Sequence, residues 1–222
     1  MFMAPSQMQP TQDDLKTAAR ALARANPSIR GVLLVGSYAR GEQTEVSDVD
    51  LVVRVDRLED VQQDQVKETF ASHLRADHDV LVDAVIVGAL DLGPRSLFRN
   101  TAAHMRFLDA GSAVLLWGED FRNLLVPPER NHVLQRCWSQ AVQLLNEPQR
   151  IDEQDVLLVA MGQMYAQTRS WPSKRAAVEW AQHPAVHAAW QRRCEGGGLG
   201  DNQGQYVDYV RMVIAELQSF VG

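Results

Sequence analysis

The stretch GVLLVGSYARGEQTEVSDVDLVVRV, residues 31–55, constrains the fold more than any other part of the chain. It holds two apolar runs with the length and the β-branched content of buried strands. Asp48 and Asp50 stand one residue apart where the second run begins. Because carboxylates rarely enter strands or cores, this pair calls for an explanation.

Alternation along a strand would place Asp48 and Asp50 on one face and Val49 on the other. Neighbouring carboxylates repel each other unless a cation neutralises them. Mg²⁺ does so through oxygen ligands, commonly together with phosphate groups. The spacing therefore favours one or two Mg²⁺ ions at this face. A turn at Ser47 that the Asp48 carboxylate merely caps is the structural alternative for Asp48.

Gly36 and Ser37 follow the first apolar run. A glycine after a strand lets the backbone turn and approach a ligand closely. If residues 38–40 begin a helical turn, its unpaired N–H groups and the Ser37 hydroxyl would bind an anion. An anion site beside a metal site suits a metal-bound triphosphate. Arg40 would either contact phosphate or brace the loop, and the sequence leaves both readings open.

Asp83 interrupts the apolar run VLVDAVIV, residues 80–87, which is expected to be a third strand. A charge in the middle of such a run is costly unless it is paired or liganded. On a neighbouring strand, Asp83 would share the ion with Asp48 and Asp50 or draw a proton from an attacking hydroxyl.

Periodicity and turn residues predict the organisation of the rest of the chain. Helices are expected over residues 11–26, 58–74 and 96–109, and a short apolar run covers residues 113–117. A Val-Pro-Pro linker ends at Pro128, and apolar residues then recur at helical spacing to the end. We predict a flexible tail over residues 1–10, a domain of strands and helices over residues 11–126, and a helical domain over residues 129–222.

Composition and charge narrow the class of protein. The 222 residues are 45% hydrophobic and 23% charged, as in ordinary globular domains. A formal net charge of -6 disfavours nucleic acid as a partner and suits a cationic substrate. Neither a signal peptide nor a membrane span is indicated, so we expect a cytoplasmic protein without a membrane partner. A monomer is favoured, and the sequence leaves the oligomeric state open.

The cysteines and histidines do not predict a metal site. Cys137 and Cys194 match neither a zinc-ligand spacing nor a disulfide framework, and both are expected to be reduced thiols. His183 and His187 are four residues apart, but Pro184 between them argues against a regular helix there. We therefore predict no zinc site.

Taken together, Gly36-Ser37, Asp48, Asp50 and Asp83 resemble the motif of the nucleotidyltransferase superfamily typified by DNA polymerase β. The closer resemblance is to the aminoglycoside adenylyltransferases that act on streptomycin and spectinomycin. It implies an α+β fold with a mixed sheet and flanking helices, followed by a C-terminal all-helical domain. The family usually has glutamate as its third carboxylate, whereas this chain has the shorter Asp83.

The resemblance extends into the helical half, where LLVAMGQMYAQTRSWPSKRAAVEWA, residues 157–181, is similar to the C-terminal domain of those enzymes. In that family the lysine of this turn reaches the nucleotide phosphates, which implies such a role for Lys174. An acidic residue at the start of the preceding helix contacts the amines of the drug. This implies Asp152, with Glu153 and Asp155 as near alternatives, although acidic residues at a helix start are also favoured by the helix dipole.

The expected function is transfer of AMP from ATP, with Mg²⁺, to a hydroxyl of a small cationic acceptor such as an aminoglycoside, with release of pyrophosphate. Asp48 and Asp50 would bind the metal, and Asp83 would ligate a second ion and orient or deprotonate the acceptor hydroxyl. The alternative is an antitoxin-like nucleotidyltransferase that adds AMP to a partner protein. The long helical half disfavours that alternative, because the minimal versions stop soon after the third strand.

Overall fold

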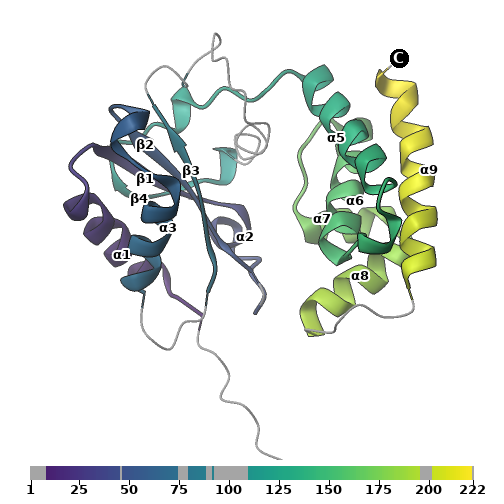
Figure 1. The fold of residues 1–222 in the computed structure, drawn as a ribbon, viewed down its shortest axis with the longest axis horizontal. Coiled ribbons are helices and arrows are strands. Elements are labelled where there is room, and N and C mark those ends of the chain that lie inside the picture. Colours follow the sequence, from purple (N-terminus) through teal and green to yellow (C-terminus); the bar gives the residue numbers. More distant parts are fainter. Residues whose placement is uncertain are drawn as a thin grey trace, which may run out of the picture. The chain divides into compact units, whose positions relative to one another are not determined.

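The structure is a computed structural model, and it describes residues 9–45, 47–74, 80–88, 92, 110–195 and 202–221. The chain divides into two compact units, Met1–Pro127 and Pro128–Gly222. Among the described residues, the strands belong to unit 1, while unit 2 is helical (Figure 1).

Unit 1 alternates short strands with helices. In chain order its elements are α1 (Gln12–Ala25), β1 (Ile29–Val35), α2 (Gly36–Arg40), β2 (Val49–Val55), η1 (Leu58–Asp60), α3 (Gln63–Ser72), β3 (Val82–Val87), η3 (Ala110–Ser112), β4 (Val114–Gly118) and η4 (Arg122–Leu124). The strands of the described residues form one sheet in the order β3-β2-β1-β4. Strand β1 is antiparallel to β2 and β4, whereas β2 and β3 are parallel. The mixed sheet with flanking helices confirms the predicted α+β class.

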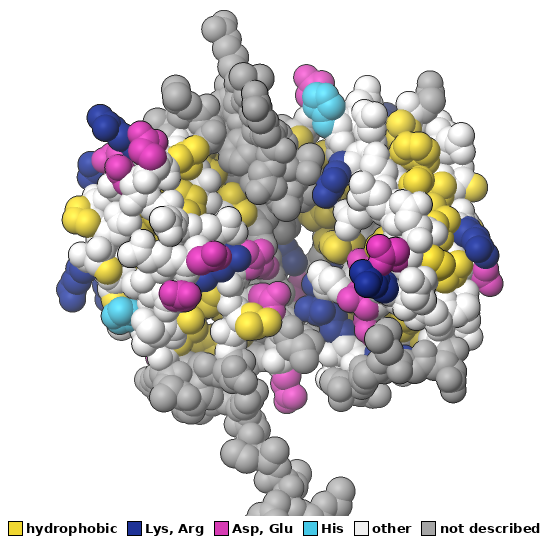
Figure 2. All heavy atoms as spheres, in the orientation of Figure 1, with side chains coloured by type: hydrophobic (Ala, Val, Ile, Leu, Met, Phe, Trp, Pro, Cys, Tyr) yellow, Lys and Arg dark blue, Asp and Glu magenta, His cyan; other side chains and the backbone are white. Residues whose placement is uncertain are grey.

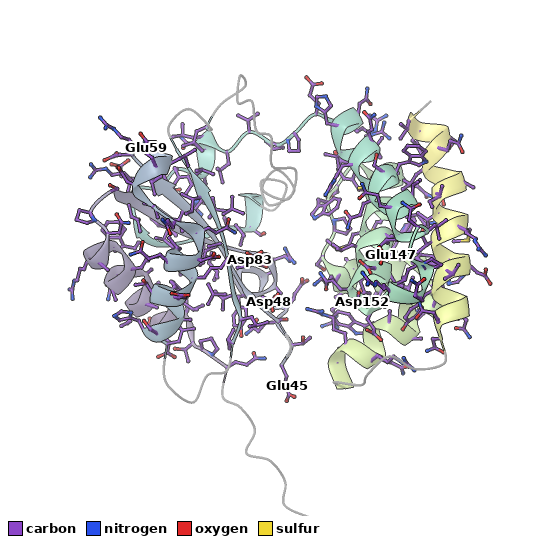
Figure 3. The ribbon with its side chains drawn as sticks, viewed as in Figure 1. Glu45, Asp48, Glu59, Asp83, Glu147 and Asp152 are labelled. Carbon is purple, nitrogen blue, oxygen red and sulfur yellow. The ribbon has the colours of Figure 1, made fainter. Side chains whose placement is uncertain are left out.

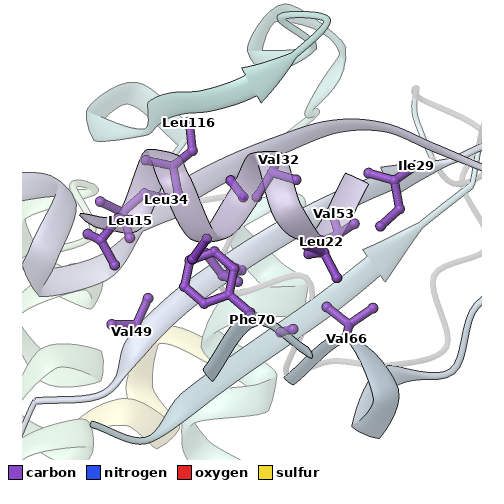
Figure 4. Close-up of a cluster of buried hydrophobic side chains, with 14 of the residues drawn as sticks. Leu15, Leu22, Ile29, Val32, Leu34, Val49, Val53, Val66, Phe70 and Leu116 are labelled. Carbon is purple, nitrogen blue, oxygen red and sulfur yellow. The ribbon is translucent and has the colours of Figure 1, made fainter. Parts of the chain in front are cut away.

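One face of the sheet packs against α1 and α3. Leu15 of α1 and Phe70 of α3 lie in one buried cluster with Val32 of β1 and Val53 of β2 (Figure 4). Burying such a side chain stabilises the fold by about 1.5–3 kcal/mol. The opposite face has a second, smaller core, in which strand residues meet the segment after η3. Its buried members are Leu33, Val35, Val52, Val87, Ala113, Phe121 and Leu125.

Helix α1 begins where the sequence predicted. The backbone N–H of Asp14 donates to the Thr11 hydroxyl at 3.3 Å, and the N–H of Thr11 donates to the Asp14 carboxylate at 2.9 Å. This reciprocal capping box satisfies two backbone donors that the first turn would otherwise leave unpaired.

The helix predicted over residues 58–74 is shorter than expected. Residues 58–60 form the 3₁₀ turn η1, the chain is extended at Val61 and Gln62, and α3 begins only at Gln63. Val61 is buried in that extended conformation. Packing of a β-branched side chain against the core has therefore outweighed helical periodicity at this point. The helix predicted over residues 96–109 lies outside the described residues.

Unit 2 confirms the predicted helical half. Its elements are α5 (Arg130–Leu144), η5 (Pro148–Arg150), α6 (Glu153–Thr168), α7 (Lys174–Ala181), α8 (Pro184–Glu195) and α9 (Gln203–Val221). Helix α6 packs against α5, α7, α8 and α9. It is buried on nearly every side, so its sequence is apolar without a clear polar face.

The expectation that Pro184 disturbs a helix between His183 and His187 was wrong. Pro184 is the first residue of α8, where a missing N–H costs nothing and the fixed φ favours the helix. The Nδ1 atom of His183 accepts a hydrogen bond from the N–H of Ala185 at 3.2 Å, so this histidine caps the helix.

On the face shown in Figure 2, acidic side chains stand beside basic ones on both units. The ion pairs of unit 1 include Arg30 with Asp56 and Arg54 with Glu119. None of the helices in the described part of the chain is long and apolar enough to cross a membrane.

Candidate active site

Strand β1 passes directly into the short helix α2 through Gly36, whose φ is +71°. A Cβ atom built on Gly36 would lie 2.2 Å from Oδ2 of Asp50, so a side chain has no room there. Both the left-handed backbone and the close approach require glycine. Ser37 follows at the start of α2 and is half-buried. The backbone of the turn therefore packs directly against Asp50, one of the predicted metal ligands.

Asp50 and Asp83 occupy opposed positions on the parallel strands β2 and β3. Adjacent strands lie about 4.8 Å apart, and opposed residues point to the same face. Val52 and Val85, two residues further along, lie at the smaller core of the sheet. Asp50 and Asp83 thus belong to the face opposite α1 and α3, at the ends of the strands near α2. The fold brings these two predicted residues together.

Asp48 precedes β2 by one residue and is exposed. The loop before it is held by Ser47, whose hydroxyl accepts a hydrogen bond from the N–H of Thr44 at 2.9 Å. Burial raises the pKa of the Tyr38 phenol, and the charge of Asp48 raises it further. The Asp48 carboxylate therefore lies close enough to α2 for its charge to act on Tyr38. Figure 3 marks Asp48 and Asp83 in unit 1.

Within the described residues, no three His, Cys, Asp or Glu side chains are gathered closely enough to hold a metal ion. The carboxylate of Asp83 instead lies 3.1 Å from the Nζ atom of Lys67. The atoms that Asp48, Asp50 and Asp83 would offer to a metal are nonetheless all carboxylate oxygens, which are the ligands that Mg²⁺ prefers. Their chemistry suits such an ion, and the opposed strand positions bring Asp50 and Asp83 together, but the three described side chains do not converge on one point.

Arg40, at the end of α2, donates from Nε to Glu42 at 2.9 Å, and only 20% of its side chain is exposed. This contact fits the loop-bracing reading of Arg40. Gly41 closes the helix in the left-handed conformation, and its N–H points to the carbonyls of Ser37 and Tyr38. The turn from Gly36 to Glu42 is therefore a compact, internally bonded unit.

Lys174 is the first residue of α7, directly after Ser173, whose hydroxyl caps that helix. Its Nζ atom donates to Oε1 of Gln154 at 2.8 Å. This bond ties the start of α7 to the first turn of α6. It brings the predicted phosphate-binding lysine close to the predicted acidic amine site within unit 2.

Asp152 and Asp155 are used in the fold of α6. The N–H of Asp155 donates to Asp152 at 2.9 Å, and the N–H of Asp152 donates to Asp155 at 3.2 Å. They form a capping box, and burial raises the pKa of the Asp155 carboxyl. The carboxylates of Asp152 and Asp155 therefore cap the start of α6. This role leaves less of their hydrogen-bonding capacity for a ligand.

Glu153 differs from its two neighbours. Only 17% of its side chain is exposed, and Oε1 lies 3.7 Å from a guanidinium nitrogen of Arg192. This oxygen is buried and accepts no hydrogen bond from the described residues. Burial raises the pKa of the Tyr206 phenol, and the charge of Glu153 raises it further. Among the three predicted acids, Glu153 alone takes no part in the capping box, and its carboxylate faces Arg192.

The sequence prediction missed Lys67 and Arg192, which contact two of the predicted acids. Neither residue belongs to a motif, and each comes from a helix distant in sequence from its partner. The sequence contains only a weak indication of the Lys67 contact. Lys67 follows Val66, whose burial fixes which face of α3 meets the sheet.

Residues 15–106 match the family model of the nucleotidyltransferase domain. This match covers less than half of the chain and coincides with much of unit 1, so this part of the chain is similar to nucleotidyltransferase domains. The fold of the chain is similar to that of a spectinomycin adenyltransferase, AAD(9) from Enterococcus faecialis, solved with ATP and spectinomycin. That structure matches with a TM-score of 0.72 and 13% identity, over 94% of this chain and 100% of the other.

A second structure, a toxin-antitoxin with AMP-PNP, is 26% identical over 50% of this chain and 79% of its own. Its TM-score of 0.36 is too low to support a conclusion about the fold. A search of curated proteins finds no match.

Proposed function

We propose that this protein transfers AMP from ATP to a hydroxyl of a small cationic acceptor, releases pyrophosphate and requires Mg²⁺. The observation that carries the proposal is the opposed placement of Asp50 and Asp83 on adjacent parallel strands, with Gly36 packed against the Asp50 carboxylate. Placing two carboxylates side by side beside a tight glycine turn serves no purpose in packing. It suits the binding of a cation and a phosphate tail.

Each predicted residue has a role that its position supports. Gly36 has no side chain, so phosphate oxygens can approach the backbone, and the Ser37 hydroxyl adds a donor. Asp48 and Asp50 would hold the divalent ion, and Asp83 would share in binding it and orient or deprotonate the acceptor hydroxyl. A bound ion would offset the charge of the triphosphate and of the leaving pyrophosphate. The attacking oxygen forms its bond to the α-phosphorus as the bond to pyrophosphate breaks.

Unit 2 would recognise the charged ends of both substrates. Lys174 would contact the triphosphate, because an ammonium attracts phosphate oxygens and this one lies at the start of α7, within hydrogen-bonding distance of Gln154. The acids Asp152, Glu153 and Asp155 would contact the amines of the acceptor. The best example of such an acceptor is an aminoglycoside, and the ligands of the spectinomycin adenyltransferase support this class.

The test is a pyrophosphate-release assay with ATP and Mg²⁺ across a panel of aminoglycosides and spectinomycin. We expect release that depends on both the drug and the metal, and that stops when EDTA is added. Release without any drug, or AMP labelling of a co-purified protein instead of a drug, would favour the alternative in which a protein is the acceptor.

We also propose domain limits of residues 11–126 and 129–222, a cytoplasmic location and a monomeric state. The cytoplasm supplies ATP and Mg²⁺, which the proposed reaction consumes and requires. Size-exclusion chromatography with light scattering tests the oligomeric state directly.

A further inference from the structure

The ion pair between Lys67 and Asp83 joins two sides of the sheet. Helix α3 packs through Val66 and Phe70 on the face that α1 also covers. Asp83 belongs to the opposite face, with Asp50. Because β3 is the edge strand of the described sheet, the lysine can reach past this edge, where its Nζ atom lies 3.1 Å from Oδ1 of Asp83.

The position of Lys67 relieves an electrostatic conflict within the site. Like charges on directly opposed strand positions destabilise a sheet, and Asp50 and Asp83 are such a pair. The ammonium of Lys67 compensates one of these charges. The pair is partly exposed, with 31% of the lysine side chain and 42% of the aspartate side chain accessible. Ion pairs of this kind contribute little net stability, so a stronger cation can displace the lysine.

We propose that Lys67 is a built-in counter-cation that holds Asp83 when no divalent ion is bound and competes with that ion for the carboxylate. Lys67 is thus a positioning residue that acts through Asp83 and lowers the affinity of the site for metal. This inference rests on the proposed function, because it needs Asp83 to be a metal ligand. The observation that carries it is the contact between the Lys67 ammonium and the Asp83 carboxylate at 3.1 Å.

The test is direct binding of Mn²⁺, a paramagnetic substitute for Mg²⁺, to the full chain without nucleotide, followed by electron paramagnetic resonance. In Lys67→Met we expect about threefold to tenfold tighter Mn²⁺ binding, because one repelling charge beside the carboxylates is gone. Lys67→Arg keeps the charge and should bind Mn²⁺ within about twofold of the wild type. Lys16→Met removes an equal charge from α1 of the same unit and should leave Mn²⁺ binding unchanged.

Equal or weaker Mn²⁺ binding by Lys67→Met would overturn the inference, and so would an equal gain in Lys16→Met. Asp50→Ala separates this failure from failure of the proposed function. If Asp50→Ala abolishes Mn²⁺ binding while Lys67→Met leaves it unchanged, the metal site stands and the role of Lys67 is wrong. If Asp50→Ala binds Mn²⁺ like the wild type, the metal assignment fails and the role of Lys67 fails with it.

Discussion

Gly36 packs so closely against Asp50 that a Cβ atom on the glycine would lie 2.2 Å from the Oδ2 atom of the aspartate. We therefore expect Gly36→Ala to push the Asp50 carboxylate out of place and to lower kcat/KM by at least about a hundredfold, or about 2.7 kcal/mol. The substitution also forces alanine into a left-handed backbone, which costs roughly 1–2 kcal/mol of stability. Pyrophosphate release and urea unfolding measure the two effects separately.

Gly41→Ala is the matched control for Gly36→Ala. Gly41 also has a left-handed φ, +69°, but a Cβ built on it meets nothing within 4 Å. The Gly41→Ala variant should lose about as much stability as Gly36→Ala, but its folded protein should keep the activity of the wild type. Equal losses of activity in the two variants would show that backbone strain, rather than contact with Asp50, is responsible.

Glu153→Gln should weaken binding of the cationic acceptor by about tenfold, because it removes the negative charge of the one predicted acid that does not cap α6. The KM for ATP should not change. Asp152→Asn should have little effect on stability, since asparagine caps a helix as well as aspartate. Acceptor titration by calorimetry compares the two variants. A larger loss of acceptor affinity in Asp152→Asn than in Glu153→Gln would show that Asp152, the cap of α6, contacts the amine instead.

Lys174→Met should raise the KM for ATP about tenfold, because it removes a cation proposed to contact the triphosphate. Arg175→Met is the matched control, since its neighbouring guanidinium is exposed and paired with Glu179 at 3.1 Å. Steady-state kinetics with varied ATP tests the pair. The phosphate role of Lys174 is wrong if both variants keep the KM of the wild type.

The two thiols should differ in reactivity. Cys137 is partly buried, and burial raises the pKa of its thiol to about 12, so it has almost no thiolate at pH 8. Cys194 is exposed on α8. Iodoacetamide at pH 8 should modify Cys194 in the folded protein and Cys137 only after unfolding, as peptide mass spectrometry would show. Rapid modification of Cys137 in the folded protein would contradict the burial.

The pKa of Cys137 also predicts how stability depends on pH. The folded protein keeps the thiol proton up to about pH 12, whereas the pKa of an unperturbed thiol is 9.0. The folded state therefore binds more protons than the unfolded state between these values, and the free energy of unfolding falls as pH rises through them. Cys137→Ser should show a smaller fall in denaturant titrations at alkaline pH.

Local rules sufficed for much of the fold. Thr11 and Asp14 marked the start of α1 because a capping box involves only neighbouring residues. Alternation and β-branched content located β1, β2 and β3 within about two residues. The rules failed where long-range packing decides, as at Val61, which is extended and buried where a helix was predicted.

The candidate site was predictable only in part, for the same reason. The opposed positions of Asp50 and Asp83 followed once their strands were assumed to be neighbours. The contact of Lys67 with Asp83 depends on how α3 packs along the edge of the sheet, which no local pattern encodes. The capping role of Asp152 was visible in the sequence, whereas the partial burial of Glu153 against Arg192 was not.

The measurement that tests the central claim most directly is pyrophosphate release by Asp50→Ala, compared with Asp56→Ala, which lies just after the far end of β2. Asp56 is exposed and paired with Arg30, so its loss should leave activity near that of the wild type. Asp50→Ala should lose at least about a thousandfold, or roughly 4 kcal/mol of transition-state stabilisation. Activity that survives in folded Asp50→Ala would contradict the account.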